Sequence, residues 1–448
     1  MSTQSLRRNN LKLSINLRTI SKIWKYVFIA SLGGFLFGFE TAVISGAERI
    51  IQELWDLNSF WHGFTVSISL IGTIFGAIGA AKPAQKYGRK RVLQVVAVMY
   101  LLSAIGCGLS FNWYMFLFFR LLGGISVGVS SVVGPLYIAE IAPAKVRGRM
   151  TGMFQIMIVS GIFIAFLTNY LFANFGDDAW RYMLGIMAIP SLLFLILLNT
   201  IPFSPRWLWL TGKKEEAKVV FESLGQTTTE LNSLDSQDQK EEPLFQSKYR
   251  KPIIYAVLLA VFNQLTGINA ILYYAPRIFE MAGFSRELAF LQPIFVGGTN
   301  LLFTLIGMSI IDKYGRKKLL LSGAVGMFIF LILAAFGLKS GASDFLLYYI
   351  IGFIACFALS QGAVIWVFIS EIFPNAVRAQ GTSLGSTTHW VMAALVSWVF
   401  PIIVENIAGG GFYIFLFYAI MVVVSFFFVM SMPETKGKSL EQIQEELK

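Results

Sequence analysis

The sequence predicts an all-α membrane protein with twelve transmembrane helices in two related halves. Only 14% of the 448 residues are charged, whereas soluble domains carry roughly 25%. The apolar segments run for about 20 residues, which lets a helix cross the ~30 Å hydrocarbon core of a bilayer. The alternating apolar and polar pattern of a membrane β-barrel is absent. Finally, two motifs occur twice, once in each half.

The repeated motifs indicate an internal duplication. PLYIAEIAPAKVRGR at 135–149 recurs as VFISEIFPNAVRAQG at 367–381, so that Glu140 and Glu371 are 231 positions apart. QKYGRKRVL at 85–93 recurs as DKYGRKKLL at 312–320, which is 227 positions later. Two unrelated motifs that recur at nearly one spacing are typical of a chain built from two related units.

The apolar runs define the predicted spans, with ends good to about 2–4 residues. They are 26–46, 64–84, 92–110, 114–139, 150–171 and 181–201 in the first half, and 252–274, 288–311, 318–338, 346–369, 381–403 and 411–430 in the second. The predicted domains are an N-terminal tail (1–25), a six-helix bundle (26–201), a linker with short helices (202–251), a second six-helix bundle (252–430) and a C-terminal tail (431–448).

The distribution of charge predicts the orientation. The net charge of +11 does not indicate nucleic-acid binding, because the basic residues cluster in short segments beside the apolar runs. The tail from Met1 to Lys25 has six basic residues and no acid, which places the N-terminus in the cytoplasm. An even number of spans returns the C-terminus to the same side. Acidic outer loops are predicted around Glu48 to Asp56 and around Asp177.

The linker and the cysteines carry no sign of an enzyme. The part of the linker near Leu224 to Pro243 is polar and is predicted to be flexible. Cys107 and Cys356 both lie in apolar runs and form no metal-binding spacing. The sequence has no Walker loop, no dinucleotide-binding fingerprint and no metal-ligand cluster, so no cofactor is expected.

Six motifs in order resemble the sugar porter branch of the major facilitator superfamily. They are GFLFGFETAVISGA (34–47), RLLGGISVGV (120–129) with the first repeated motif, SPRWLWLTGKKEEA (204–217), NQLTGINAILYYAP (263–276), IWVFISEIFPNAVR (365–378) and PETKG (433–437). The resemblance covers nearly the whole chain. It implies two six-helix bundles related by a pseudo-two-fold axis, with a central sugar site and alternating access.

Side-chain amides in apolar helices are the first candidates for the sugar site. A neutral sugar needs hydrogen-bond partners without fixed charge, and an amide offers both donors and acceptors. The same amides could instead join helices to one another. Gly267 can break the helix between Gln264 and Asn269, which would otherwise point about 140° apart. The resemblance assigns the sugar site to Gln155, Asn263, Gln264, Asn269, Asn300, Trp366, His389 and Trp390, with Tyr273 and Tyr274 at the outer gate. Asn263 and His389 depart from the family pattern.

Glu40 and Arg120 are charged residues inside apolar helices, where a charge is costly and suggests a function. The resemblance places a proton-carrying acid at Glu40 and its partner at Arg120. A carboxyl group that alternates between a buried setting and contact with a cation can take up and release a proton. The alternative is a static salt bridge.

The family's cytoplasmic gate maps onto charged residues beside the repeated motifs. The implied set is Arg89, Glu140, Arg147, Arg149, Asp312, Arg316, Glu371, Arg378 and Glu434. Gln85 and Phe203 stand where the first half is expected to carry acids, which predicts a weaker inner latch and an inward-open resting state. Ala363 stands where a proline is usual, so the tenth span is expected to bend less.

We therefore predict a monosaccharide transporter, for a hexose or a pentose, driven by proton symport. Glu40 favours this over a facilitative uniporter, and the short C-terminal tail argues against a transporter-like sugar sensor. The expected partners are the sugar, protons and the lipid bilayer. The short loops favour a bacterial inner membrane. Both termini are expected in the cytoplasm, and the protein is expected to be monomeric.

Overall fold

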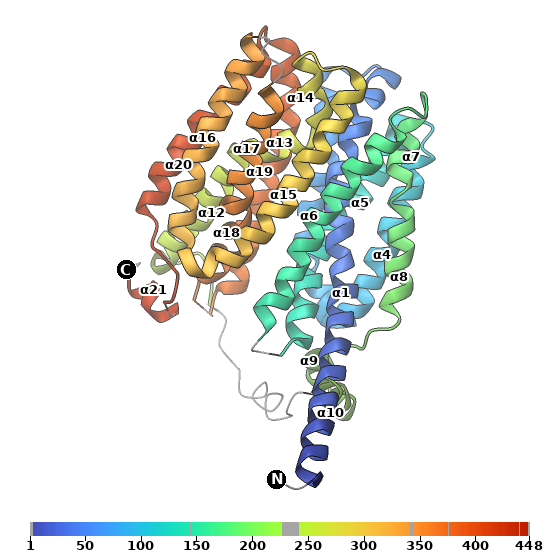
Figure 1. Ribbon diagram of the computed structural model, residues 1–448, viewed down its shortest axis with the longest axis vertical. Coiled ribbons are helices and arrows are strands. Elements are labelled where there is room, and N and C mark those ends of the chain that lie inside the picture. The colour runs from blue at the N-terminus through green and yellow to red at the C-terminus, as the bar shows by residue number, and fades with distance from the viewer. Residues whose placement is uncertain are drawn as a thin grey trace.

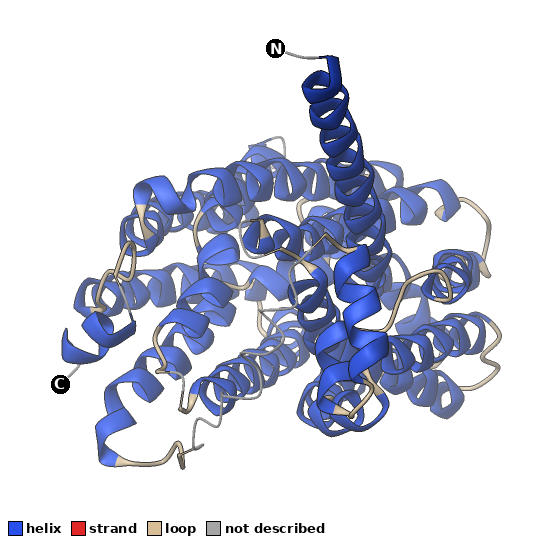
Figure 2. Cartoon of the chain, turned by 90° about the horizontal axis from the view of Figure 1, so that it is seen from below, coloured by secondary structure: helices blue, strands red, loops and turns tan. Residues whose placement is uncertain are grey.

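Apolar helices make up most of the described part of the chain. The computed structural model describes residues 3–143, 146–225, 242–340, 345–374, 376–438 and 440–446, and in that part of the chain it contains helices and no strand (Figure 2). Twelve segments are long and apolar enough to span a membrane, which confirms the predicted number. The predicted flexible linker lies largely outside the described residues.

Several helices are longer than the predicted spans. The first half contains α1 (Thr3–Leu54), α2 (Ser59–Gly79), α3 (Ala81–Tyr87), α4 (Arg89–Gly108), α5 (Trp113–Ile141), α6 (Arg147–Phe172), α7 (Ala179–Gly185) and α8 (Ala188–Leu198). Then come α9 (Pro205–Leu210), α10 (Lys214–Ser223) and a 3₁₀ turn (Ser247–Tyr249). The second half contains α12 (Arg250–Leu265), α13 (Ile268–Tyr273), α14 (Ala275–Met281), α15 (Arg286–Tyr314), α16 (Arg316–Ser340), α17 (Leu346–Leu359), α18 (Gln361–Glu371), α19 (Arg378–Asn406) and α20 (Gly410–Ser431), followed by α21 (Leu440–Glu446).

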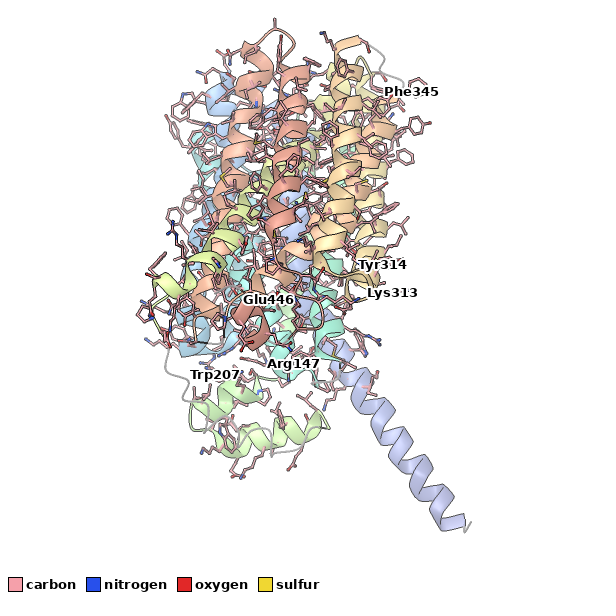
Figure 3. All side chains as sticks on the ribbon, turned by 90° about the vertical axis from the view of Figure 1, so that its left-hand side faces the viewer. Arg147, Trp207, Lys313, Tyr314, Phe345 and Glu446 are labelled. Atoms are coloured by element: carbon pink, nitrogen blue, oxygen red, sulfur yellow. The ribbon has the colours of Figure 1, made fainter. Side chains whose placement is uncertain are left out.

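The two halves form two bundles that lie side by side (Figure 1). They meet where α6 packs on α15 and where α2 packs on α19, and α1 also contacts α13 and α14. We call the end that carries α9, α10 and α21 the inner end, and the opposite end, where α1 meets α14, the outer end (Figure 1). Arg147, Trp207, Lys313 and Glu446 lie at the inner end, and Phe345 lies at the outer end (Figure 3).

Close backbone contact holds α1 against α6. A methyl group added to Gly38 would lie 1.8 Å from the carbonyl oxygen of Ile158. Such a contact is possible only without a side chain, and small residues serve this purpose between membrane helices. The GFLFGFETAVISGA motif therefore brings the α1 backbone directly onto α6.

Two spans are broken, one as predicted and one against prediction. Gly267 has φ +82° and separates α12 from α13, which confirms the expected break. The tenth span is also broken, between α17 and α18, at Ser360 with φ −116° and ψ −88°. The expectation that Ala363 would leave this span straighter is wrong. The chain departs from helical geometry three residues earlier, where the Ser360 hydroxyl donates to the Cys356 carbonyl at 2.6 Å.

The predicted outer loop from Glu48 to Asp56 is mostly helix. α1 continues to Leu54, and the connection to α2 is confined to residues 55–58. Glu48 is buried, with a side-chain exposure of 1%. The acids were assigned to a loop because of their charge, but Glu48 has cationic partners in the fold that allow it to be buried.

Candidate substrate site and ion-pair networks

Three amides around the break at Gly267 form one connected cluster. The amide nitrogen of Gln264 donates to Asn263 Oδ1 at 3.0 Å, and Asn269 Nδ2 donates to Gln264 Oε1 at 2.8 Å. Because α12 and α13 are separate helices, the two side chains that a straight helix would point apart can meet. The structure thus brings together three of the predicted site residues.

His389 and two tryptophans complete this cluster from α18 and α19. Gln264 Nε2 lies 3.1 Å from Nε2 of His389 and 3.3 Å from its Nδ1. The Trp366 ring is 4.8 Å from the His389 ring, and Trp390 lies 4.9 Å from it. Trp390 also contacts Phe37 of α1 at 5.5 Å, so it lies where the two halves meet. The arrangement combines amides with flat rings, which suits the polar edge and the C–H face of a sugar ring.

Gln361 is a member of the cluster that the sequence pattern did not single out. Asn263 Nδ2 donates to Gln361 Oε1 at 3.2 Å, and Gln361 is 1% exposed. Its own amide nitrogen is buried without a partner, which is costly unless another acceptor arrives. The signal that could have found it is the same as for Asn263, namely an amide within an apolar helix.

Gln155 and Asn300 stand apart from this cluster. Gln155 lies on α6 and Asn300 on α15, the two helices that pack across the halves. Neither side chain forms a hydrogen bond with another described residue. Their amides are available to a ligand from the first half and from the middle of the second.

The two tyrosines that were predicted at the outer gate, Tyr273 and Tyr274, are buried. The Tyr274 hydroxyl donates to the Ser397 carbonyl at 3.0 Å, and its ring stacks on Phe400 with 4.8 Å between centroids. Tyr273, at the end of α13, is 2% exposed. Both therefore tie the short α13 segment into the bundle.

Glu40 and Arg120 form a buried ion pair between α1 and α5. Glu40 Oε1 accepts a hydrogen bond from Arg120 Nη1, and Ser69 Oγ lies 3.4 Å from the same oxygen. The two side chains are 3% and 0% exposed. Among the described residues, Arg120 Nε and Nη2 have no hydrogen-bond partner, so the guanidinium is only partly satisfied by this single acid. In a buried pair of this kind, loss of the charge on one side chain leaves the charge on the other side chain uncompensated, which is costly.

The second half has a dense network at its inner end. Arg316 donates to both oxygens of Glu371, at 3.1 and 2.8 Å, and Arg316 Nη1 lies 3.0 Å from Asp312. The backbone N–H groups of Arg316, Lys317 and Lys436 donate to Glu434 at 2.9 to 3.0 Å. Burial alone would raise the pKa of Glu434, but these backbone hydrogen bonds hold it below its ordinary value.

The first half replaces part of this network by an aromatic stack. Arg89 Nη2 donates to Glu140 at 2.7 Å, as Arg316 does to Glu371. Phe203, 231 positions before Glu434, stacks on Trp207 at 5.5 Å and lies beneath Lys90 Nζ at 5.2 Å. Phe203 has no oxygen atom, so it cannot accept hydrogen bonds as Glu434 does from the backbone N–H groups of Arg316 and Lys317.

Three predicted gate arginines are not in these ion pairs. Arg147 and Arg149 are exposed, and Arg378 Nε donates to the Phe373 carbonyl at 3.4 Å. Glu140 and Glu371 are paired within their own halves by Arg89 and Arg316.

Among the described residues, the side-chain hydrogen bonds and ion pairs that join the two halves lie at the outer end. Arg277 of α14 contacts Glu48 and Gln52 of α1, and Arg49 contacts Glu280. Asn406 donates to Ser59 at 2.8 Å, and Trp398 Nε1 donates to the Phe60 carbonyl at 3.1 Å. These polar contacts between described residues therefore join the halves at the outer end.

The structure has twelve spanning helices in two bundles, and a buried cluster of amides and aromatic rings lies where the bundles meet. The polar contacts between the two halves that are described above lie at the outer end. Together these features define a multi-pass membrane transporter. The profile of the sugar (and other) transporter family matches residues 26–447, and the chain belongs to that family.

The relatives with the same architecture include sugar symporters. The chain is 36% identical to the D-xylose-proton symporter of Escherichia coli K12, over 95% of each chain. It is 35% identical to the arabinose-proton symporter of Bacillus subtilis, over 93% of each. The inward-open structure of the E. coli xylose transporter XylE matches with a TM-score of 0.84, at 33% identity, over 95% of this chain and 99% of that one.

Proposed function

We propose that the protein carries a monosaccharide, a pentose or a hexose, across the membrane together with a proton, by alternating access. The observation that carries the proposal is the buried Glu40–Arg120 pair. A carrier that uses a proton gradient needs a group whose charge changes during the cycle, and an ion pair in low dielectric is sensitive to such a change. The names of the two symporter relatives support the same reading.

The sugar site consists of the amide cluster with its rings. Gln264, Asn263 and Asn269 supply hydrogen bonds, His389 adds a donor or acceptor, and Trp366 provides a face for the sugar. Gln155 and Asn300 approach from α6 and α15, and Trp390 closes the site against α1. These residues come from both halves, so movement of one half against the other changes access to the sugar.

Proton coupling follows from the surroundings of Glu40. With Arg120 at hydrogen-bond distance the carboxylate is favoured, and when the pair separates, burial favours the protonated acid. A proton taken up from the outer side in one state can then be released to the inner side in the other. Arg120 Nε and Nη2, which have no partner in this structure, offer a second acceptor a place during that change.

The structure corresponds to an inward-facing state in this cycle. The polar contacts at the outer end support this assignment, as do the TM-scores of 0.84 and 0.83 with the inward-open and the partially occluded inward-open structures of XylE. The inner networks would link the halves in the outward-facing state, when Arg147, Arg149 and Arg378 find acidic partners. Tyr273 and Tyr274 act at the outer gate.

The inner end faces the cytoplasm of a bacterial cell, with both termini on that side. The basic tail before Lys25 supports this orientation. We retain the division into two bundles, 26–201 and 252–430, joined by the 202–251 linker, and we propose that a single copy is the working unit.

Uptake of labelled sugars into proteoliposomes tests the function. D-xylose, L-arabinose and D-glucose are offered with and without an imposed pH gradient. Accumulation of one of them above the equilibrium level, only when the outside is acidic, is expected. Equilibration without accumulation for every sugar would favour the uniporter, and no uptake would reject sugar transport.

A further inference from the structure

The outer end holds a group of charged side chains that the sugar and the Glu40 site do not use. We call Glu48, His62, Arg277 and Glu405, with Gln52, the outer ion cluster. Arg277 Nε donates to Glu48 at 3.1 Å and Nη1 to Glu405 at 2.6 Å. Gln52 Nε2 donates to Glu405 at 3.0 Å, and Arg277 also contacts Gln52. These residues come from α1, α2, α14 and α19, so the cluster spans both halves.

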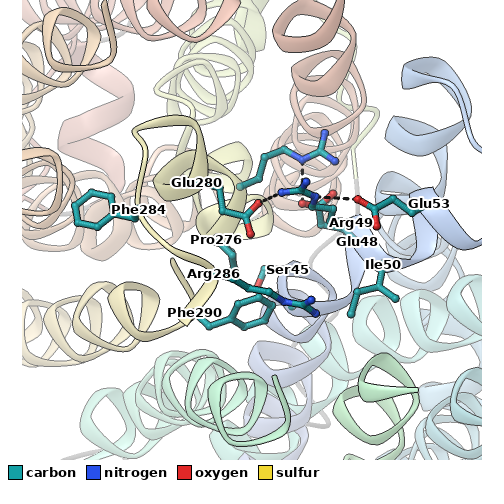
Figure 4. Close-up of a pocket in the computed structure, with 12 residues that line it drawn as sticks. Ser45, Glu48, Arg49, Ile50, Glu53, Pro276, Glu280, Phe284, Arg286 and Phe290 are labelled. Atoms are coloured by element: carbon teal, nitrogen blue, oxygen red, sulfur yellow. Dashed lines mark hydrogen bonds and ion pairs between the residues drawn. The ribbon is translucent and has the colours of Figure 1, made fainter. Parts of the chain in front are cut away.

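A second ion pair lies beside the cluster. Arg49 of α1 lies between Glu280 of α14 and Glu53 of α1, and contacts both (Figure 4). Together they border a cavity of about 410 Å³ that reaches Glu48 and Arg277. Two members of the outer ion cluster, Glu48 and Arg277, therefore line a cavity that water can enter.

His62 lies at the centre of the cluster and is completely buried. Its Nε2 is 2.7 Å from Glu48 Oε2, and its Nδ1 is 3.7 Å from Glu405 Oε1. The Nε2 contact does not have hydrogen-bond geometry, and the Nδ1 contact is too long for a hydrogen bond, so both are charge contacts. The Tyr274 ring covers the imidazole edge to face at 5.8 Å. The imidazole thus contacts one carboxylate from each half.

The charges of the cluster balance only when His62 is protonated. Glu48 and Glu405 carry two negative charges, and Arg277 supplies one positive charge. The charged residues of α5, which also packs on α2, are engaged elsewhere, Arg120 with Glu40 and Glu140 with Arg89. An imidazolium at His62 supplies the missing positive charge, and a neutral ring leaves an excess negative charge in a buried place.

We propose that His62 is a second proton-binding site of this protein, at which a proton taken up from the outer side fastens the two halves at the outer end. The proton comes from water in the outer cavity and binds an imidazole nitrogen; no other bond changes. Loss of that proton leaves Glu48 and Glu405 sharing Arg277 alone, and the outer end opens more readily. The proposal rests on alternating access as proposed above, but not on Glu40.

Spectroscopic distances across the outer end test the proposal. Leu54 and Ile407 are exposed, belong to different halves and lie outside the cluster. Both are replaced by cysteine and spin-labelled in a Glu40→Gln protein in which Cys107 and Cys356 are alanine. Without sugar, the ratio of closed to open distances is measured from pH 5.5 to 8.5. A proton bound only in the closed state changes that ratio by up to about tenfold per pH unit.

The expected result is that the closed fraction falls as the pH rises above about 6.5, where a solvent-exposed imidazole loses its proton. In His62→Gln the ratio should be independent of pH and shifted toward open, and in His62→Lys it should be independent of pH and shifted toward closed. A pH dependence that persists in His62→Gln would overturn the proposal, as would a flat ratio in the parent.

A second readout covers a variant that fails to fold. The chain contains only two histidines, so ¹⁵N-histidine NMR of the unmodified protein can follow His62 beside His389. A single imidazole that titrates together with the distance change supports the proposal. A His62 ring that stays neutral from pH 5.5 upward contradicts it. Sugar uptake measured separately shows whether transport itself is intact.

Discussion

Gln264 joins the parts of the proposed sugar site, so its replacement by alanine gives the sharpest test of that site. The side chain is 1% exposed, donates to Asn263, accepts from Asn269 and lies against His389. Truncation removes any bond to the sugar and also releases the partners from their positions. One lost hydrogen bond of about 1.4 kcal/mol lowers affinity tenfold, so we expect the sugar Kd to rise by at least that factor.

The same change should also lower stability. Asn263 Oδ1 and Asn269 Nδ2 would each lose a buried partner, at about 1–3 kcal/mol for each group. Affinity is measured by tryptophan fluorescence in nanodiscs, which Trp366 and Trp390 beside the site make possible. Thermal unfolding of the same samples separates loss of fold from loss of binding.

Asn169→Ala is the matched control for this experiment. Asn169 is 2% exposed and donates to the Val43 carbonyl at 3.1 Å in the first half, away from the amide cluster. Its truncation should lower stability by a similar amount for each lost partner and leave the sugar Kd unchanged. Equal Kd values for the Gln264→Ala and wild-type proteins, or an equal loss of affinity in both variants, would refute the role of Gln264.

Three further predictions concern the ion pairs. A methyl group on Gly123 would lie 2.8 Å from Glu40 Oε1, so Gly123→Ala should reduce uptake more than tenfold. In the control Gly79→Ala the added methyl group would have no neighbouring atom within 4 Å, so uptake should not be reduced in this way. Phe203→Glu combined with Gln85→Asp should shift thiol labelling from the inner to the outer side, and an unchanged pattern would reject the weak-latch account. The pKa of Glu434 is lowered in the folded protein. The Glu434 carboxylate therefore stabilises the fold at pH values above the ordinary carboxyl pKa, and this stabilisation is lost as the pH falls through the lowered pKa. The Tm difference between wild type and Glu434→Gln should therefore be present at pH 7 and shrink steadily as the pH is lowered below the ordinary carboxyl pKa, and a difference that is constant with pH would contradict this.

The sequence was informative about features that a single type of residue is enough to predict. The repeated motifs and apolar runs predicted twelve spans, and Gly267 predicted a break because its backbone tolerates a positive φ. The order of six motifs along the chain was enough to indicate the family. Buried acids were harder to predict from the sequence. The pattern around Glu48 is typical of an acidic outer loop, but an acid that is buried against partners from α14 and α2 gives the same pattern.

The sequence could not show which side chains contact one another in the folded protein. The tenth span breaks at Ser360, which is neither a proline nor a glycine. Gln361, the next residue, contacts Asn263 of another helix, and the sequence alone does not show that contact. His62 gave no signal, since its two acids are 14 residues before it and far along the chain in α19.

Accumulation of sugar by proteoliposomes that contain wild type or Glu40→Gln is the most direct test of proton-driven transport. Glu40→Gln keeps the size and hydrogen-bonding capacity of the side chain but cannot ionise. Wild type should concentrate the sugar when the outside is acidic, whereas Glu40→Gln should still exchange labelled for unlabelled sugar but should not concentrate it. Concentration of the sugar by Glu40→Gln under the same pH gradient would contradict the coupling role of Glu40, and a wild type that never concentrates sugar would contradict symport itself.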